Sequence, residues 1–353
     1  MAARAASCTV ALLLVLVLAA VTALMPLTTA ASTYFDYSSF MNLSGPNQLS
    51  GIITSKITPS YTYNTIDHPI TPTHGQQLFI GLGFSGGPLG GNVKELSPTI
   101  TYTRWFHGLK PGQTFGFRVL SRTLIGYGGG APPPFARIFM GGEQDVRGFE
   151  TWSVGPLAYI PSTTTVTVLN QDGSARMQKS IVNGVEQMTN VSMPVPFYQI
   201  VFPGGDTQGV ANMEYRFKIF GPLTLAAFMD AGVNRVTFRD KLKLNPDRIT
   251  NLNGEFPSAA FENEAVLVPG SQKPRVSTGL ELQIMMPVVN APFRVYYARN
   301  LSYLQTTLMA PVAVDPAMFP NQATYVNARQ TIGTAIPFEE RHDMFRFTIS
   351  RTF

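Results

Sequence analysis

The chain has 353 residues, of which 44% are hydrophobic and only 13% are charged, and it contains 31 glycines, 27 prolines, 24 phenylalanines and 13 tyrosines. This composition excludes a disordered chain, and its turn formers and aromatics argue against a helical bundle. The formal net charge of +5 is spread along the chain, so no basic run indicates a nucleic-acid partner. Four scattered histidines and one cysteine form no metal-ligand cluster, so we expect neither a metal nor a cofactor.

Residues 1–31 have the features of an export signal. Arg4 supplies positive charge, residues 10–25 form an apolar run, and the small residues around Ala31 offer a cleavage zone. A marginal transmembrane helix is the alternative, but no basic stop-transfer cluster follows the run. Cleavage would remove Cys8 and leave a domain of residues 32–353 that no disulfide can stabilise.

After this segment the hydrophobic pattern has a period of two residues, which is typical of β-strands, and no helical stripe is sustained. In residues 77–85, for example, Leu78, Ile80, Leu82 and Phe84 alternate with polar residues and glycines. The pattern predicts nine strands, with a further candidate at 34–43. The nine ranges are 51–65, 76–87, 95–106, 113–128, 208–221, 223–238, 273–287, 291–303 and 344–353.

The connections between these strands alternate in length. Short breaks follow some strands, whereas the stretches 150–207, 239–272 and 304–343 read as long loops rich in glycine, asparagine and proline. This asymmetry is typical of an outer-membrane β-barrel, in which one strand face meets lipid and the other lines a polar lumen. A soluble β-sandwich also alternates, but it hides its apolar face against a second sheet. Aromatic residues near strand ends suit the interfacial girdles of such a barrel: Trp105, Phe106, Tyr127, Tyr297 and Tyr303.

Strand parity places two acids inside the predicted barrel. If Met213 and Met229 face lipid, then Glu214 and Asp230 point into the barrel lumen from two neighbouring strands. An unpaired charge that is buried there is costly. Arg147 lies in a glycine-flanked turn on the preceding long loop, and its planar guanidinium can bind a carboxylate with two hydrogen bonds. We therefore predict that residues 137–160 fold into the lumen and place Arg147 on both acids. The alternative is that Arg147 is a solvated loop residue.

Three motifs follow one another along the chain: Val146-Arg147-Gly148-Phe149, Phe228-Met229-Asp230-Ala231-Gly232, and the aromatic final segment 344–353. Together and in this order they resemble the BamA-type outer-membrane assembly factors of the bacterial surface antigen family. Shorter similarities at residues 60–65, 72–75, 86–92 and 132–137 extend the resemblance over about residues 32–353. The resemblance implies a loop locked in the lumen by Arg147, Gly148, Phe149, Glu214, Asp230 and Gly232.

The last strand is similar to the C-terminal β-signal of outer-membrane proteins. Phe345, Phe347, Ile349 and Phe353 lie at even spacing on one face. An exposed terminal strand of this kind can pair with the edge of another strand. An ordinary final barrel strand would look the same, so this segment indicates location more strongly than function.

The chain departs from the family in size. BamA-type proteins have sixteen strands preceded by periplasmic POTRA modules, whereas this sequence predicts nine or ten strands and no POTRA module. Three accounts stay open: a fragment or misjudged start, a short paralogue that closes a small barrel, or two chains that assemble a larger ring. An isolated half-barrel with unpaired edges in lipid is excluded by its cost.

The resemblance implies a protein of the bacterial outer membrane that folds and inserts β-barrel proteins, as an intact or a degenerate copy. Its expected partners are nascent outer-membrane proteins, membrane lipid, and either assembly lipoproteins or a second barrel chain. A passive porin or a polypeptide-translocating pore is the alternative. A porin would suit the predicted inward cations, which are Arg118, Arg122, Arg216, Lys218 and Arg294. An enzyme is not expected, because no serine lies in a nucleophile-elbow setting.

Overall fold

The computed structural model describes residues 43, 45–46, 50–182, 185–238, 242–286 and 291–349. The predicted signal segment 1–31, nearly all of the candidate strand 34–43, and Phe353 lie outside these residues. Among the described residues, no helix has the length and apolarity needed to cross a membrane.

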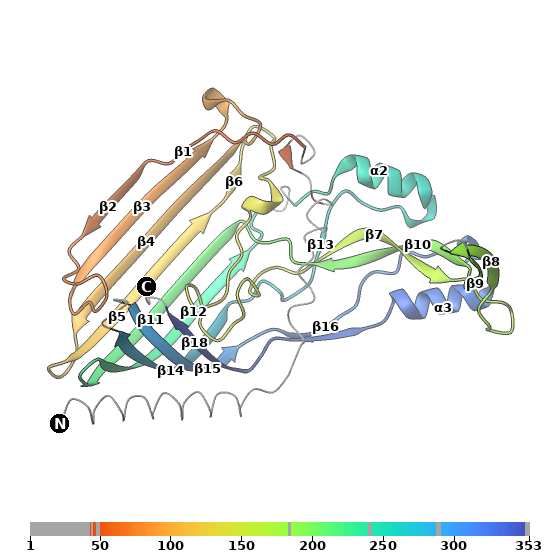
Figure 1. Ribbon diagram of the computed structural model, residues 1–353. Helices are drawn as coiled ribbons and strands as arrows, with labels where there is room; N and C mark the ends of the chain where they lie inside the picture. The colour runs from red at the N-terminus through yellow and green to blue at the C-terminus, as the bar shows by residue number, and fades with distance from the viewer. Residues whose placement is uncertain are drawn as a thin grey trace. The chain divides into compact units, whose positions relative to one another are not determined.

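One large antiparallel sheet dominates the described chain. Its strands lie side by side in the order β1-β3-β4-β5-β11-β12-β14-β15-β18, with β2 also paired to β3 and β6 to β4 (Figure 1). Their bounds are β1 Lys56–Ile57, β2 Ser60–Asn64, β3 Gly75–Ser85, β4 Glu95–His107, β5 Gln113–Thr123, β6 Ile125–Gly126, β11 Thr207–Phe220, β12 Leu223–Arg235, β14 Arg275–Met286, β15 Ala291–Ser302 and β18 Asp343–Ile349. All nine predicted strands are therefore present, the first divided into β1 and β2 and the fourth into β5 and β6.

This sheet buries its polar and charged face and exposes its apolar face, which is the reverse of the arrangement in a water-soluble protein. On β11, Asn212 and Glu214 are buried, whereas Met213 between them is 43% exposed. On β14, Glu281 is fully buried and the neighbouring Leu280 is 55% exposed. An apolar face left open beside a buried, charged face is the arrangement that a membrane-spanning sheet requires.

The long connections contain more structure than their composition predicted. They hold a three-stranded sheet, two two-stranded sheets, two helices, and short 3-10 helices at Pro257–Ala259 and Pro316–Met318. Two further 3-10 helices, Gly87–Leu89 and Pro134–Ala136, lie in other connections. The elements are β7 Ala158–Thr167, β8 Met177–Val182, β9 Val185–Asn190, β10 Ser192–Val201, α2 Pro246–Glu255, β13 Val266–Leu267, β16 Gln305–Leu308, α3 Gln322–Ile332 and β17 Ile336–Glu339.

Two short helices, α2 and α3, form although the sequence has no sustained helical stripe. α2 begins at Asn245, whose side chain accepts hydrogen bonds from the first helical N–H groups, and Pro246 suits the first helical position. It buries only Ile249 and Leu252, which is too little to give a periodic stripe in the sequence. α3 begins in the same way at Asn321.

Separate hydrophobic clusters hold the long connections together. One joins Ala158 and Ile160 of β7 to Leu252 of α2 and Phe261. A second joins Leu157 to Leu308 of β16, and a third packs Ala328 of α3 against β7 and β10. The three stretches that read as loops therefore share buried contacts with one another.

Candidate functional site

The connection between β6 and β7, residues 127–157, forms an inserted loop that packs against the charged face of the large sheet. Its own core contains Met140, Val146, Phe149 and Val154, which pack against Val210 of β11. Backbone bridges join Met140 to Val154 and Gly142 to Val146, so the loop has defined structure. This fold aims Arg147 at the sheet.

The structure brings Arg147 together with both predicted acids and with a third. Its Nε donates to Asp230 Oδ2 at 2.7 Å and its Nη2 to Asp230 Oδ1 at 2.9 Å, which is a two-pronged contact. Nη1 donates to Glu214 Oε2 at 3.0 Å and to Glu281 Oε2 at 3.1 Å. The backbone N–H of Arg147 also donates to Asp230. Arg147 is 2% exposed, and all three carboxylates are buried.

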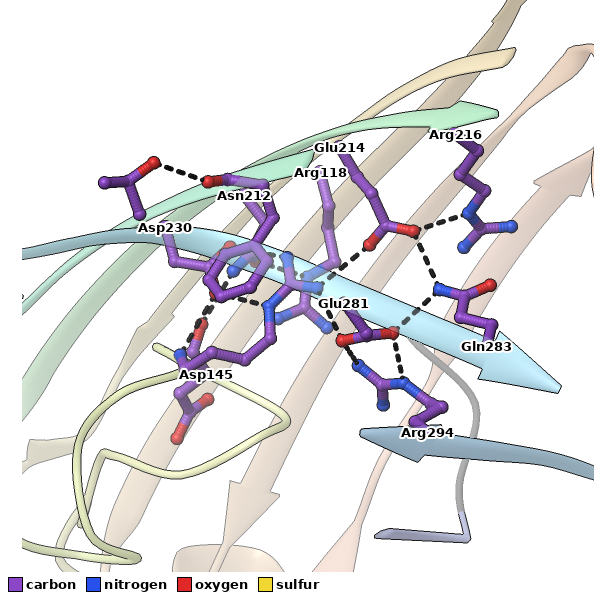
Figure 2. Close-up of polar contacts among 12 residues, drawn as sticks. Arg118, Asp145, Asn212, Glu214, Arg216, Asp230, Glu281, Gln283 and Arg294 are labelled. Carbon is purple, nitrogen blue, oxygen red and sulfur yellow. Dashed lines mark hydrogen bonds and ion pairs between the residues drawn. The ribbon is translucent and has the colours of Figure 1, made fainter. Parts of the chain in front are cut away.

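Two further arginines balance the charge of these acids. Arg294 of β15 donates to both oxygens of Glu281 at 2.6 Å, and Arg216 of β11 donates to Glu214. Gln283 bridges the two glutamates at 3.1 and 2.7 Å. Figure 2 shows the carboxylates of Glu214 and Glu281 linked through these partners. Three carboxylates and three guanidiniums thus form one buried, charge-balanced network, in which the interactions offset the cost of desolvation.

Aromatic and small residues shape the space around Arg147. The Phe228 ring lies under its guanidinium, with the central carbon 3.8 Å from the ring centre, a cation–π contact. Gly279 on the next strand leaves room for that ring, because a Cβ there would lie 2.7 Å from Phe228. Gly232 likewise leaves room for Val146 of the loop.

Gly148 combines an unusual backbone conformation with close contact to the sheet. Its φ is +92°, and a Cβ at this position would lie 2.4 Å from Asn300 Oδ1 and 3.0 Å from the Ala298 side chain. Asn300 in turn donates to the carbonyl of Gly148 at 2.8 Å. Only glycine therefore fits this turn without strain.

The inserted loop is also fixed at points away from Arg147. Asn212 of β11 donates to the carbonyl of Asp145 at 2.7 Å, and Arg118 of β5 donates to the carbonyl of Gln144. At its far end Glu150 pairs with Arg346 of β18. The loop thus connects the middle of the sheet to the strand at its edge.

Glu281 and Arg294 take part in the network although the sequence prediction of the site did not include them. Both residues lie in predicted strands, and the alternation of side chains puts them on the same face as Gly279 and Asn300. Extending the parity argument one strand beyond Asp230 would have found Glu281, because Ala226 of β12 lies opposite it.

The assignment of Trp105 to an aromatic girdle was wrong. Trp105 lies on the charged face and is 2% exposed, with its ring over Gly116 and the Arg216 guanidinium 4.2 Å from the ring centre. Adjacent residues of a strand face opposite sides, so Trp105 and Phe106 cannot both lie in an outer girdle, and Gly116 provides the space for the inward ring.

The final described strand, β18, pairs with β15 and has no other described strand partner. Phe345, Phe347 and Ile349 lie on the apolar face of the sheet and are exposed. The fourth predicted residue of this segment, Phe353, lies outside the described residues. Within the described chain no group of three or more His, Cys, Asp or Glu side chains is arranged to hold a metal ion.

The chain matches one protein family and is similar in part to known proteins. Residues 28–307 match the Omp85 superfamily domain. The outer membrane protein assembly factor BamA of Nitratidesulfovibrio vulgaris is 28% identical over 177 residues, which are 49% of this chain and 17% of that protein. The crystal structure of Haemophilus ducreyi BamA lacking POTRA domains 1–3 aligns with a TM-score of 0.44 and 13% identity, over 83% of this chain and 42% of that one.

The chain thus spans less than half the length of these two relatives. The family match, however, covers most of its sequence. The chain belongs to the Omp85 superfamily, and it is an integral outer-membrane protein that is similar to BamA over part of its length.

Proposed function

We propose that this chain supplies the membrane-embedded part of an outer-membrane protein assembly factor, and that nascent barrel proteins pair with the edge strand β18. The observation that carries the proposal is the fixed connection between that edge and the inserted loop. Glu150 of the loop pairs with Arg346 of β18, while Arg147 of the same loop binds acids on three neighbouring strands.

The edge strand offers a physical means of acting on a client. A strand paired on one side presents backbone N–H and C=O groups on the other, and leaving them unpaired in lipid costs several kcal/mol per group. An incoming strand that adds to β18 would satisfy these groups and would find an apolar outer face formed by Phe345, Phe347 and Ile349. No covalent step is required.

The contacts of the inward arginines argue against a passive channel. A channel would need its charged side chains available to ions, yet Arg118, Arg216 and Arg294 make contacts with the loop or with acids of the sheet, and only Arg122 and Lys218 of the five predicted inward cations are exposed. The inserted loop also occupies the charged face at the level of Arg147. These contacts fix the inserted loop to the sheet, and this favours an assembly factor over an open channel.

The test is a folding assay with the full chain in liposomes. An unfolded outer-membrane barrel protein is added, and its folding is followed by the gel shift between its heated and unheated forms. We expect faster folding than in protein-free liposomes, and photo-cross-linking of the client to a probe at Phe347. The same probe at Ile100, which is exposed on the same face in the middle of the sheet, is the matched control.

Equal folding rates with and without the chain would overturn the proposal. So would equal cross-linking at Phe347 and Ile100, because the client would then have no preference for the edge. A rise in ion conductance of the liposomes without faster folding would instead favour the channel.

A further inference from the structure

Arg104 on β4 is a charged residue on the apolar face of the sheet. Its neighbours Thr103 and Trp105 are buried on the opposite face, whereas Arg104 is exposed. In the sheet it lies between Gln76 of β3 and Phe117 of β5. The side chain therefore projects on the side that meets lipid.

The position of Arg104 along the strand distinguishes it from the other charges on this face. Among the described strand residues, Arg235, Arg299 and Asp343 also lie on the apolar face, but all three are next to the long connections. Arg104 lies at the opposite end, near the short turn between β4 and β5. In outer-membrane barrels the short turns face the periplasm. Arg104 is thus at the level of the periplasmic leaflet.

The surroundings of Arg104 contain polar and aromatic groups. Its Nη1 donates to Gln76 Oε1 at 3.4 Å and to the Tyr102 hydroxyl at 3.5 Å, and its guanidinium lies 4.8 Å from the centre of the Phe106 ring. Within the described chain no carboxylate forms an ion pair with it. The guanidinium therefore has polar and aromatic neighbours, but none of them neutralises its charge.

A hollow of about 460 Å³ opens beside this side chain. Besides Arg104, its lining includes Gln76, His74, His107 and Phe106. The two imidazole rings stack with their centres 5.1 Å apart. The hollow therefore offers room, a permanent positive charge and additional nitrogen groups at one rim of the sheet.

The carboxylate of Asp67, in the turn before β3, is engaged elsewhere. It accepts hydrogen bonds from Thr73 Oγ1 and from the backbone N–H groups of Thr73 and His74. Burial raises the pKa of Asp67, but these hydrogen bonds outweigh burial and lower that pKa below its ordinary value. The Asp67 carboxylate therefore interacts with the turn and with His74 Nδ1, 3.4 Å away, and it forms no ion pair with Arg104 among the described contacts.

We propose that Arg104, together with the side-chain amide N–H groups of Gln76, binds the phosphate of an anionic phospholipid in the periplasmic leaflet, while the Tyr102 hydroxyl orients Gln76 by donating to its Oε1 at 2.9 Å. The planar guanidinium matches two phosphate oxygens, and a positive charge on a lipid-facing strand is tolerated best at the interface. Phe106 and Tyr102 are residues that favour the same depth. The acyl chains would lie along the outward side chains of the neighbouring strands.

The test is native mass spectrometry of the full chain, released from detergent micelles that contain a graded amount of phosphatidylglycerol. We expect Arg104→Gln to weaken binding about tenfold, the effect of losing a charged hydrogen bond. Arg104→Lys should lose less, because it keeps the charge but not the fork. Lys110→Gln, which removes an exposed charge from the adjacent turn, should bind like the unmodified chain.

Inorganic phosphate, added alone at the same concentrations, separates a lipid site from a free phosphate site. Phosphate should leave the bound lipid in place. Displacement of the lipid by equimolar phosphate, unchanged binding by Arg104→Gln, or an equal loss for Lys110→Gln would each overturn the proposal. The heat-induced gel shift of each variant verifies that it is folded before binding is measured.

Discussion

Arg147 makes several buried interactions at once. It binds three carboxylates and one aromatic ring, and each carboxylate would lose a charge partner if the guanidinium were removed. Removing one member of a buried ion network costs about 3–5 kcal/mol, because the remaining charges stay buried. Lysine would not restore the network, since an ammonium cannot form the two-pronged contact with Asp230 and reach both glutamates.

We therefore expect Arg147→Ala to lower the free energy of unfolding by about 3–5 kcal/mol and Arg147→Lys to recover only part of it. The measurement is the temperature at which the heat-induced gel shift occurs, together with limited proteolysis of the inserted loop. Arg176→Ala, which removes an exposed arginine, is the control. If Arg147→Ala matched Arg176→Ala in both readouts, the loop would not depend on this network.

Gly148 permits a second prediction about the same turn. Gly148→Ala adds a methyl group that meets Asn300 and Ala298, and it also forces alanine into a left-handed conformation. The conformation alone costs about 1–2 kcal/mol. Gly129→Ala separates the two effects, because Gly129 has φ +75° in the same loop and open space around its Cβ position. Gly148→Ala should lower the gel-shift temperature more than Gly129→Ala; equal shifts would show that contact with the sheet contributes nothing.

At the scale of elements, parity within a strand was the most reliable information in the sequence. It located the strands and placed Glu214 and Asp230 on one face, because the side-chain period of a strand is fixed at two. Applied to β4, the same parity puts Trp105 and Phe106 on opposite faces, so the two residues cannot share an outer girdle, and Gly116 of the neighbouring strand leaves space for the inward Trp105 ring. The short helices α2 and α3 were missed because capping by Asn245 and Asn321, and packing against other loops, stabilise them more than any stripe.

The connections between elements depend on a second buried ion pair. Arg275 of β14 donates to both oxygens of Glu340 at 2.7 and 3.1 Å, and the backbone N–H of Leu304 donates to the same carboxylate at 2.6 Å. These contacts join the start of β14, the end of β15 and the approach to β18. Glu340 thus fixes the connection between β15 and β18.

We expect Glu340→Gln to loosen this connection without unfolding the sheet. Loss of the charge leaves Arg275 buried without its carboxylate, a local cost of about 3–5 kcal/mol. Amide hydrogen exchange should increase in β16 and β17 and stay unchanged in β11 and β12. The adjacent Glu339→Gln is the control, because Glu339 is exposed and pairs only with His342 among the described contacts. Equal exchange in the two variants would contradict the proposed role of Glu340.

At the scale of the whole molecule, the sheet hides its charges and displays its aliphatic side chains. In water, an arginine that replaces an exposed isoleucine costs almost nothing, whereas on the lipid face of a barrel it costs about 2–4 kcal/mol near the midplane. Ile100 is 48% exposed on β4, and the adjacent Thr101 faces the other way. Arginine substitutions at Ile100 and at Thr101 therefore test whether the apolar face of the sheet meets lipid or water.

Ile100→Arg should therefore reduce the fraction of chains that resist urea extraction from outer membranes. Thr101→Arg, which puts the same side chain on the polar face, should insert nearly as well as the unmodified chain, because a guanidinium there can reach polar groups. The measurement is quantitative blotting of membrane and extracted fractions after expression at equal level. If Ile100→Arg inserted as well as Thr101→Arg, the exposed apolar face of this region would not be the face that meets lipid. The position of Arg104 on that face would then no longer support a lipid site.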